Sequence, residues 1–350
     1  MTQGRFRKQQ LEEFAAAALR SVGVQPDHAI VTAKRLVEAD ARGRTGHGLI
    51  RLEPYIRRIT AGGINLDSRI RVLRETPTSA LVDGDNGLGQ VVMTHATELA
   101  ITKAKANGIA WIGTVHSNHA GAAGLYPLMA AQEGLIAIYF AVANANGMPP
   151  WGGTDPLLGT NPIAVAIPAK NSAPFLLDIA TTQTSHGSIK VAAQNGEQMP
   201  VGWVIDHEGE PITDPNRAGE GTLVPIGGYK GSGLNIAIGL LAGTMNGAAF
   251  LSSVIDHRVE QDTPTNTGQS IFVMRSDLFQ PADAALATMA AHLDELRTSS
   301  TKNGQPVRLP GDTAAAMEQA SATLGVAVSP VLVEQLNTLA SQLRIHHLGK

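Results

Sequence analysis

Cysteine is absent from the 350-residue chain. Without thiols the protein has no disulfide, no thiolate metal ligand and no cysteine nucleophile, and this composition is compatible with a reducing compartment. The first ten residues also lack the apolar core of a signal peptide. We therefore expect a cytoplasmic protein.

Charge is also scarce, because only 16% of the residues are charged and the formal net charge is −3. No long basic run is present, so we expect neither nucleic acid nor an anionic membrane as a partner. An apolar content of 43% is typical of a compact chain with a substantial core. These numbers favour an enzyme that acts on small molecules.

One stretch, residues 231–255, has no charged residue and carries glycine at every fourth position from Gly239 to Gly247. A membrane-spanning helix with a small-residue face would show this pattern. Polar residues such as Asn235, Asn246 and Ser252 interrupt the stretch. We therefore predict a buried helix that packs closely through its glycines, and no membrane partner.

The glycine motif of the common dinucleotide-binding fold is also missing. That motif is Gly-x-Gly-x-x-Gly after a strand. The two nearest candidates, which begin at Gly87 and Gly231, lack the third glycine at the required spacing. From the residues alone, this argues against a Rossmann site.

Hydrophobic periodicity predicts an α/β protein whose two ends are helical. Leu11 begins a helical pattern that stops at Gly23, and Pro26 starts a second helix that ends near Arg42. Further helices are predicted at 91–106, 122–132, 234–250, 282–297, 313–324 and 330–343. Strands are predicted at 70–73, 80–82, 110–115, 135–142, 163–167, 175–178, 201–205 and 270–274. The polar stretch 258–269 is expected to be a surface excursion.

The segment from Asp40 to Tyr55 carries the first chemical signal. His47, Arg51 and Tyr55 are four residues apart, and on a helix such residues share one face. A proton-transfer group beside a guanidinium fork suits a small carboxylic acid. An ordinary polar helix face is the alternative, and Pro54 argues against an uninterrupted helix.

A series of short motifs makes this signal more specific. Arg42-Gly-Arg-Thr-Gly-His-Gly and Val115-His-Ser-Asn-His-Ala-Gly precede Trp151-Gly-Gly and Leu158-Gly-Thr-Asn-Pro, and then follow Leu177-Asp-Ile-Ala-Thr-Thr, Pro200-Val-Gly-Trp, Thr213-Asp-Pro and Pro225-Ile-Gly-Gly-Tyr-Lys-Gly-Ser-Gly. In this order, from about Leu11 to about Gly311, they resemble the malate/L-lactate dehydrogenase family without a Rossmann fold. Its relatives include ureidoglycolate, sulfolactate, diketogulonate and cyclic-imino-acid oxidoreductases.

The resemblance implies a non-Rossmann α/β fold with a mixed sheet and a helical layer from both termini, assembled as a homodimer. Three domains are expected: a helical one at 1–75 plus 305–350, a cofactor-binding one at 76–120 plus 225–304, and one at 121–224 that completes the active site. The activity expected is NAD(P)-dependent hydride transfer between a 2-hydroxy acid and its 2-oxo acid. Reduction of a cyclic imino acid such as pyrroline- or piperideine-2-carboxylate is the alternative within this chemistry.

By the same resemblance, His47 is the proton donor and His119 a second catalytic histidine, while Arg51 and Tyr55 bind the substrate carboxylate. The resemblance also places residue 46 at the substrate. Here Gly46 replaces the family's serine or threonine, so the identity of the substrate is not fixed by the resemblance. The expected cofactor-binding residues, for NAD or NADP, are Thr160, Asn161, Asp178, Ala180, Thr181, Thr182, His186, Tyr229, Lys230, Gly311 and Asp312. His186-Gly-Ser departs from the family's Arg-Gly-Lys, so the choice between NAD and NADP stays open.

Three other interpretations remain. A non-catalytic binder of small acids would keep the scaffold, although it needs no proton donor. A cofactor-independent isomerase could use His47 and His119 as two bases. The His116-x-x-His119 pair could bind a metal, but no cysteine or nearby carboxylate completes such a site, so no metal is expected.

Overall fold

The computed structural model describes residues 4–302 and 304–349, with only the backbone of residues 186, 194 and 195. Its centre is a seven-stranded sheet in the order β2-β3-β4-β11-β5-β6-β7. The strands are β2 (Arg71–Thr76), β3 (Ser79–Asp83), β4 (Ile109–Ser117), β11 (Thr267–Arg275), β5 (Leu135–Ala141), β6 (Ile163–Ala169) and β7 (Ser172–Ile179). Within this sheet β3 and β4 pair in parallel and the other neighbours pair antiparallel. The predicted mixed sheet is confirmed.

Helices α4 (Gly89–Asn107) and α5 (Leu125–Gln132) cover one face of the sheet. The side chains between them and the strands are mostly small, since α4 contributes Ala96, Ala100 and Ala104, all fully buried. Small side chains let the helix approach the strands closely. Tyr126 of α5 and Tyr139 of β5 fill the remaining space, with ring centroids 5.2 Å apart.

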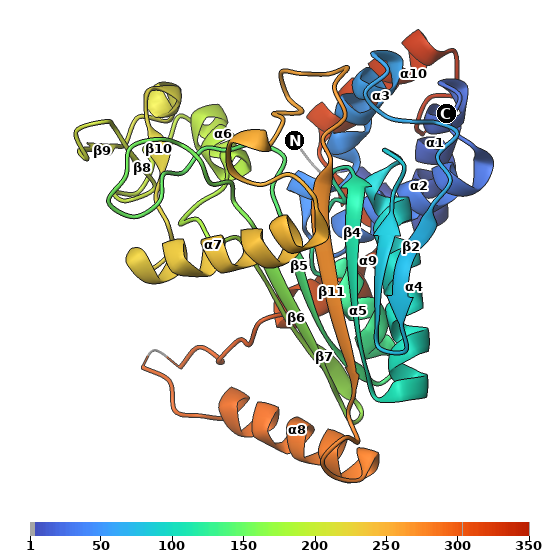
Figure 1. Ribbon diagram of the computed structural model, residues 1–350. Coiled ribbons are helices and arrows are strands. Elements are labelled where there is room, and N and C mark those ends of the chain that lie inside the picture. Colours follow the sequence, from blue (N-terminus) through green and yellow to red (C-terminus); the bar gives the residue numbers. More distant parts are fainter. Residues whose placement is uncertain (1–3, 303, 350) are drawn as a thin grey trace.

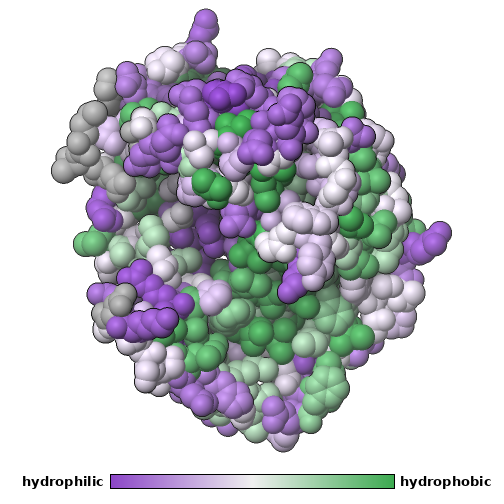
Figure 2. Space-filling model, turned by 90° about the vertical axis from the view of Figure 1, so that its left-hand side faces the viewer, coloured by the Kyte–Doolittle hydropathy of each residue, from purple (hydrophilic) through white to green (hydrophobic). Residues whose placement is uncertain are grey.

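Helix α7 (Tyr229–Ala242) lies on the opposite face, where Ser270 of β11 donates its hydroxyl to the carbonyl of Leu241. Farther along the strands this face is more open. The register places five partly exposed apolar side chains in one row across five strands: Trp111, Phe272, Ile138, Val165 and Leu177. Figure 2 shows a broad apolar area on this side of the molecule.

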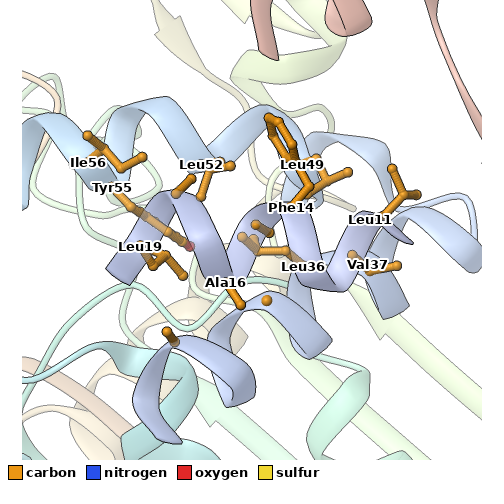
Figure 3. Close-up of a cluster of buried hydrophobic side chains, with 14 of the residues drawn as sticks. Leu11, Phe14, Ala16, Leu19, Leu36, Val37, Leu49, Leu52, Tyr55 and Ile56 are labelled. Carbon is orange, nitrogen blue, oxygen red and sulfur yellow. The ribbon is translucent and has the colours of Figure 1, made fainter. Parts of the chain in front are cut away.

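Both ends of the chain form one helical layer, as predicted. Helices α1 (Lys8–Ser21), α2 (Pro26–Ala41), α3 (Leu52–Thr60) and α10 (Pro330–Leu343) share a buried cluster. Figure 3 shows Leu11 and Leu19 of α1 in this cluster with Leu36 of α2 and Leu52 of α3. A short strand at each end completes the layer, because β1 (Gly4–Phe6) pairs antiparallel with β12 (Val326–Val328).

A second lobe contains a three-stranded sheet of β8 (Val204–Ile205), β9 (Pro211–Ile212) and β10 (Thr222–Leu223), beside α6 (His186–Asn195). Helix α8 (Ala282–Arg297) stands apart from the helical layer and buries only Ala285 among its described residues. Helix α9 (Asp312–Leu324) returns the chain to the layer, where Glu318 pairs with Arg42.

Several predicted boundaries were wrong. The helix predicted at 234–250 begins at Tyr229 and ends at Ala242, since Gly243 closes the helix and Gly247 has a positive φ of 74°. The strand predicted at 201–205 shrinks to β8, and the helix predicted at 122–132 begins at Leu125. Across the described residues, the structure has no helix that is both long and apolar enough to cross a membrane.

Candidate active site

The segment that carries His47 and Arg51 is not one continuous helix. Helix α2 ends at Ala41, Gly43 has a positive φ of 74°, and two short 3-10 turns, Thr45–His47 and Leu49–Arg51, lead into α3. The single helical face inferred from the spacing was therefore wrong, because glycines interrupt the helix. Pro54 falls in the first turn of α3, where its missing N–H costs little.

The carboxylate of Asp40 holds this segment in place. Its Oδ2 accepts the backbone N–H of Leu49 at 2.7 Å in a buried position. A Cβ at Gly48 would lie 2.0 Å from Oδ1 of Asp40, so only glycine lets the turn pass so closely. Burial raises the pKa of Asp40 from 3.8 to about 7, against the lowering effect of the Leu49 hydrogen bond.

His119 is held by its neighbour Asn118, at the end of β4. The side-chain amide of Asn118 donates to the carbonyls of Asn86 and Gly87, and the Asn118 carbonyl accepts from Gln269. Gly89, the first residue of α4, also lies close to the backbone of Asn118 and His119. A Cβ at Gly89 would lie 2.2 Å from the backbone oxygen of Asn118. Gly89 therefore allows α4 to pack closely against the loop that carries His119.

The fold brings the two predicted catalytic histidines together. The rings of His47 and His119 stack with centroids 5.6 Å apart, and Nδ1 of His119 lies 2.7 Å from the hydroxyl of Tyr55. Tyr55 also accepts from the amide of Gln90 at 2.7 Å. Thus Tyr55 contacts His119, and its role in binding a carboxylate stays a prediction.

Both histidines favour the neutral form. Burial, together with the positive charges of Arg51 and Arg44, lowers the pKa of His47 from 6.5 to about 4. Burial also lowers the pKa of His119 well below 6.5, with contributions from Arg51, His47 and His257. At neutral pH the site therefore contains two uncharged imidazoles beside guanidinium groups.

Two arginines lie near His47. Nε of Arg51 donates to the carbonyl of Gly46 at 2.7 Å, which fixes the guanidinium beside the histidine turn. Nε of Arg44 lies 3.7 Å from Oδ2 of Asp178, at the end of β7. Burial raises the pKa of Asp178, although Arg44 opposes this shift. Asp178, predicted to bind cofactor, is thus part of the ionisable cluster around His47.

Gly46 is exposed at this site, and a Cβ built there meets no atom within 4 Å. The space that the family's serine or threonine side chain would occupy is therefore open. Residue 46 can carry a hydroxyl without a steric clash, and its place at the substrate stays a prediction.

The sequence analysis did not identify two residues of the site, His257 and Arg58. His257 stacks on His119 with centroids 5.7 Å apart, and its Nδ1 donates to the carbonyl of Asn144 at 2.9 Å. Arg58 is buried and donates to the carbonyls of Gly63, Glu260 and Thr263. Together with His119 and Tyr55, they line a cavity of about 10 Å³, on the scale of a single water molecule.

The polar stretch 258–269 is consequently not a simple surface excursion. Thr265 and Gln269 are buried, and β11 begins at Thr267. Arg58 ties the backbone of this stretch to α3. The polar composition of this stretch predicted exposure to solvent. The sequence does not show that the carbonyls of Glu260 and Thr263 accept hydrogen bonds from the buried Arg58.

Some predicted cofactor residues are buried and hydrogen-bonded inside the protein. Asn161 donates to Asn235 of α7, and the Asn235 amide donates to the Thr181 hydroxyl at 2.7 Å. Thr182 is also buried and donates to the Thr184 carbonyl. These side chains join the ends of β6 and β7 to α7, so their observed contacts are structural.

Other predicted cofactor residues remain accessible. Tyr229 and Lys230 are exposed at the start of α7, whose N-terminus has no side-chain cap, and Thr160 and Ala180 are half-buried. An uncapped helix N-terminus with a lysine fits a phosphate group. Gly311 packs against Leu176 of β7, while Asp312 pairs with Arg297 at 2.8 Å. His186 was also predicted, but its side chain lies outside the described residues.

The His116–His119 pair does not converge on one point. Nδ1 of His116 lies 3.0 Å from Asp83, whereas His119 faces Tyr55. Among the residues that the structure describes, no group of three His, Asp or Glu side chains is arranged to hold a metal ion.

Comparison with known proteins gives matches over nearly the whole chain. The family model described as malate/L-lactate dehydrogenase matches residues 6–337. The malate dehydrogenase of Pyrococcus horikoshii is 36% identical over 98% of this chain and 97% of its own. The (2R)-3-sulfolactate dehydrogenase (NADP(+)) of Chromohalobacter salexigens is 38% identical over 68% of this chain and 71% of its own. The ureidoglycolate dehydrogenase (NAD(+)) of Escherichia coli K12 is 30% identical over 93% and 92%.

Solved structures agree. The sulfolactate dehydrogenase of Methanocaldococcus jannaschii superposes with a TM-score of 0.89 at 31% identity, covering 98% of each chain. The delta1-piperideine-2-carboxylate reductase of Pseudomonas syringae gives 0.86 at 27% identity, covering 96% of this chain and 100% of the other. The fold and these relatives thus define an oxidoreductase on a non-Rossmann α/β fold. The chain belongs to the malate/L-lactate dehydrogenase family.

Proposed function

We propose that the protein is an NAD(P)-dependent oxidoreductase that transfers hydride between nicotinamide and a small 2-oxo or 2-hydroxy acid. The observation that carries this proposal is the stacked pair His47–His119 beside Arg51 and Arg44. Histidine is a common acid–base group, and guanidinium groups bind carboxylates bidentately. The proposal is supported by similarity to a malate dehydrogenase, a (2R)-3-sulfolactate dehydrogenase and a ureidoglycolate dehydrogenase.

His47 is the proton-transfer group in this proposal. In the oxidation direction its neutral ring takes the proton of the substrate hydroxyl; a bound nicotinamide would supply the acceptor for the hydride from the same carbon. In reduction the protonated ring returns the proton to the developing alkoxide. A substrate carboxylate on Arg51 offsets the positive charge that lowers the pKa of His47, so substrate binding itself brings this pKa closer to neutrality.

The second arginine favours a substrate with two acidic groups. Arg44 is about half exposed, and its ion pair with Asp178 is long at 3.7 Å, so its guanidinium can bind another anion. Arg51 and Arg44 both act electrostatically on His47 and therefore lie near the reacting carbon. We infer that a 2-hydroxy acid with a second carboxylate or a sulfonate binds better than a monoacid such as lactate.

The cofactor, when bound, supplies the hydride acceptor. Tyr229 and Lys230 at the uncapped start of α7 are suited to hold its phosphates, and Thr160, Ala180 and Gly311 are half-buried backbone positions beside the ends of β6 and β7. The printed names of the relatives include both an NAD(+) and an NADP(+) enzyme, so either dinucleotide is a candidate.

We also propose a homodimer that buries the row of Trp111, Phe272, Ile138, Val165 and Leu177. An apolar sheet face of this extent is typical of an interface between protein chains (Figure 2). Light scattering tests the proposal: wild type should have the mass of two chains, and Phe272→Asp should shift it toward one. A wild-type mass of 36.6 kDa would contradict the dimer.

The decisive experiment for the activity is spectroscopic. The protein is mixed with NADH or NADPH and a panel of 2-oxo acids, and the absorbance of the reduced nicotinamide is followed. We expect oxidation of the nicotinamide with 2-oxo diacids ahead of monoacids. Binding without any turnover would indicate a non-catalytic binder, and substrate isomerisation without a nucleotide would indicate an isomerase.

Reduction of a cyclic imino acid is the second candidate. It is supported by the structural similarity to the piperideine-2-carboxylate reductase. Its substrate also places a carboxylate beside an sp² carbon, so Arg51 and His47 serve it equally. Pyrroline- and piperideine-2-carboxylate therefore belong in the same panel, and a preference for them over every 2-oxo acid would replace the first assignment.

A further inference from the structure

The hydroxyl group of Tyr55 is enclosed between two partners. Gln90 is fully buried and donates its side-chain amide to the Tyr55 oxygen at 2.7 Å. On the other side, the Tyr55 oxygen lies 2.7 Å from Nδ1 of His119. A phenol has a single hydrogen to donate. The direction of this hydrogen bond therefore depends on which atoms around His119 can accept.

Gly121 settles that direction. Its backbone N–H points to Nδ1 of His119 at 3.3 Å, and a backbone N–H can only donate. Nδ1 must then be the unprotonated ring nitrogen, and it also accepts the hydrogen of Tyr55. Donation thus runs one way, from Gln90 to Tyr55 to His119.

A neutral imidazole with Nδ1 unprotonated carries its hydrogen on Nε2. No group among the described residues hydrogen-bonds to Nε2 of His119, so this N–H is available to a ligand. The surroundings also keep the ring neutral, because burial and the charges of Arg51, His47 and His257 oppose its protonation. His47 differs, since its buried Nδ1 has no hydrogen-bond partner in the described structure.

We propose that Gln90 and Tyr55 are positioning residues that lock His119 as a permanent Nε2–H donor toward the substrate oxygen. His47, whose ring nitrogens are not locked in this way, is then left to move the proton. The role toward the substrate rests on the proposed function. The locked tautomer does not, because it follows from the hydrogen bonds of the protein alone.

Nitrogen NMR of protein with ¹⁵N-labelled histidine rings tests the lock directly. Pyrrole-type and pyridine-type nitrogens resonate in separate regions, and the His119 signals are assigned by their loss in His119→Asn. At neutral pH we expect a pyridine-type Nδ1 and a pyrrole-type Nε2. A protonated Nδ1, in either a neutral or a charged ring, overturns the proposal whether or not any substrate is turned over.

Tyr55→Phe removes the donor while keeping the ring. We expect the His119 signals to move toward the average of the two nitrogen types, because the long Gly121 bond alone remains. His257→Phe is the matched control, since His257 contacts His119 through the ring face and the substitution keeps an aromatic ring there. It should leave the tautomer unchanged, and thermal unfolding checks that both variants are folded. An unchanged His119 spectrum in Tyr55→Phe overturns the proposal.

Kinetics then separate positioning from direct carboxylate binding. One net hydrogen bond corresponds to about a threefold to tenfold change in a population. If Tyr55 positions His119, Tyr55→Phe lowers kcat by about that factor and leaves KM for the acid nearly unchanged. If Tyr55 instead binds the carboxylate, KM rises and kcat stays, which overturns the positioning role even though the enzyme remains an oxidoreductase.

Discussion

The imidazole rings of His47 and His119 stack with centroids 5.6 Å apart and planes inclined by 17°. Two positive charges at this distance, shielded from water, repel strongly, so the pair accommodates at most one extra proton. Groups coupled in this way titrate as a unit. The stacking therefore favours states in which no more than one of the two rings is protonated.

Replacing His47 with alanine is expected to remove most turnover while nicotinamide binding stays intact. A positioned general acid or base contributes roughly 10²–10⁴-fold to the rate. Steady-state rates at saturating substrate measure the loss, and fluorescence titration with the reduced dinucleotide measures binding. Wild-type turnover in the variant would show that another group moves the proton.

Arg51→Lys should mainly raise KM for carboxylate substrates, because an ammonium group cannot reproduce the guanidinium fork. The Gly46 hydrogen bond that orients the side chain is also lost. Arg57→Lys is the matched control, since that exposed arginine of α3 pairs only with Glu53 among the described residues. An unchanged KM, or an equal loss with a substrate amide, contradicts the role of Arg51.

Gly46→Ser is expected to fold like wild type, because its Cβ enters open space. If residue 46 faces the substrate, the new hydroxyl changes the ranking of acids in the activity panel. Gly48→Ala, two residues away, should instead lower the melting temperature, because its Cβ collides with Asp40. A panel ranking that Gly46→Ser leaves untouched would place residue 46 outside the pocket.

Arg44→Gln should raise the pKa of His47 from about 4 toward its ordinary value, because it removes a neighbouring positive charge. The acid limb of the pH profile of kcat/KM for 2-hydroxy acid oxidation then moves to higher pH. KM for diacids should also rise more than KM for monoacids. An acid limb that stays in place, with equal effects on both kinds of acid, argues against Arg44 at the site.

Asp40→Asn tests the buried carboxylate through stability. The pKa of Asp40 is raised from 3.8 to about 7 in the folded state, so its contribution to stability is present at low pH and is lost as pH rises toward 7. Asparagine does not ionise. The melting temperature of wild type relative to the variant should therefore fall between about pH 4 and about pH 7, then level off. A difference that does not depend on pH contradicts a neutral Asp40.

The strands and terminal helices were predictable because their signals are local. Aliphatic runs such as Leu135–Ala141 and the helical periodicity from Leu11 depend only on near neighbours in sequence. The broken helix before Arg51 was visible in part, since three glycines surround His47. Its path was not, because the close contact of Gly48 with Asp40 depends on how the turn folds back on α2.

His47 was predicted from its spacing to Arg51 and Tyr55 as well as from the family resemblance, and His119 from the resemblance, whereas the residues that contact them required the structure. Gln90 follows a glycine-rich turn that was considered only as a dinucleotide motif and set aside. The glycines did carry a signal, namely the close packing of α4 against the His119 loop. His257 had no comparable signal, because its stretch is polar and the buried arginine that anchors it, Arg58, is distant in sequence.

The shared cluster of the two chain ends has a consequence for the order of folding. Helices α1 to α3 carry or flank His47, Arg51 and Tyr55, yet part of their apolar surface is covered by Leu336 and Leu339 of α10. During synthesis these helices leave the ribosome before α10, and the chain from Ala61 to Ser329 must be synthesised before α10 emerges. The candidate site is therefore completed only after α10 has been synthesised, and a ribosome that stops before α10 releases a fragment whose apolar helices are exposed.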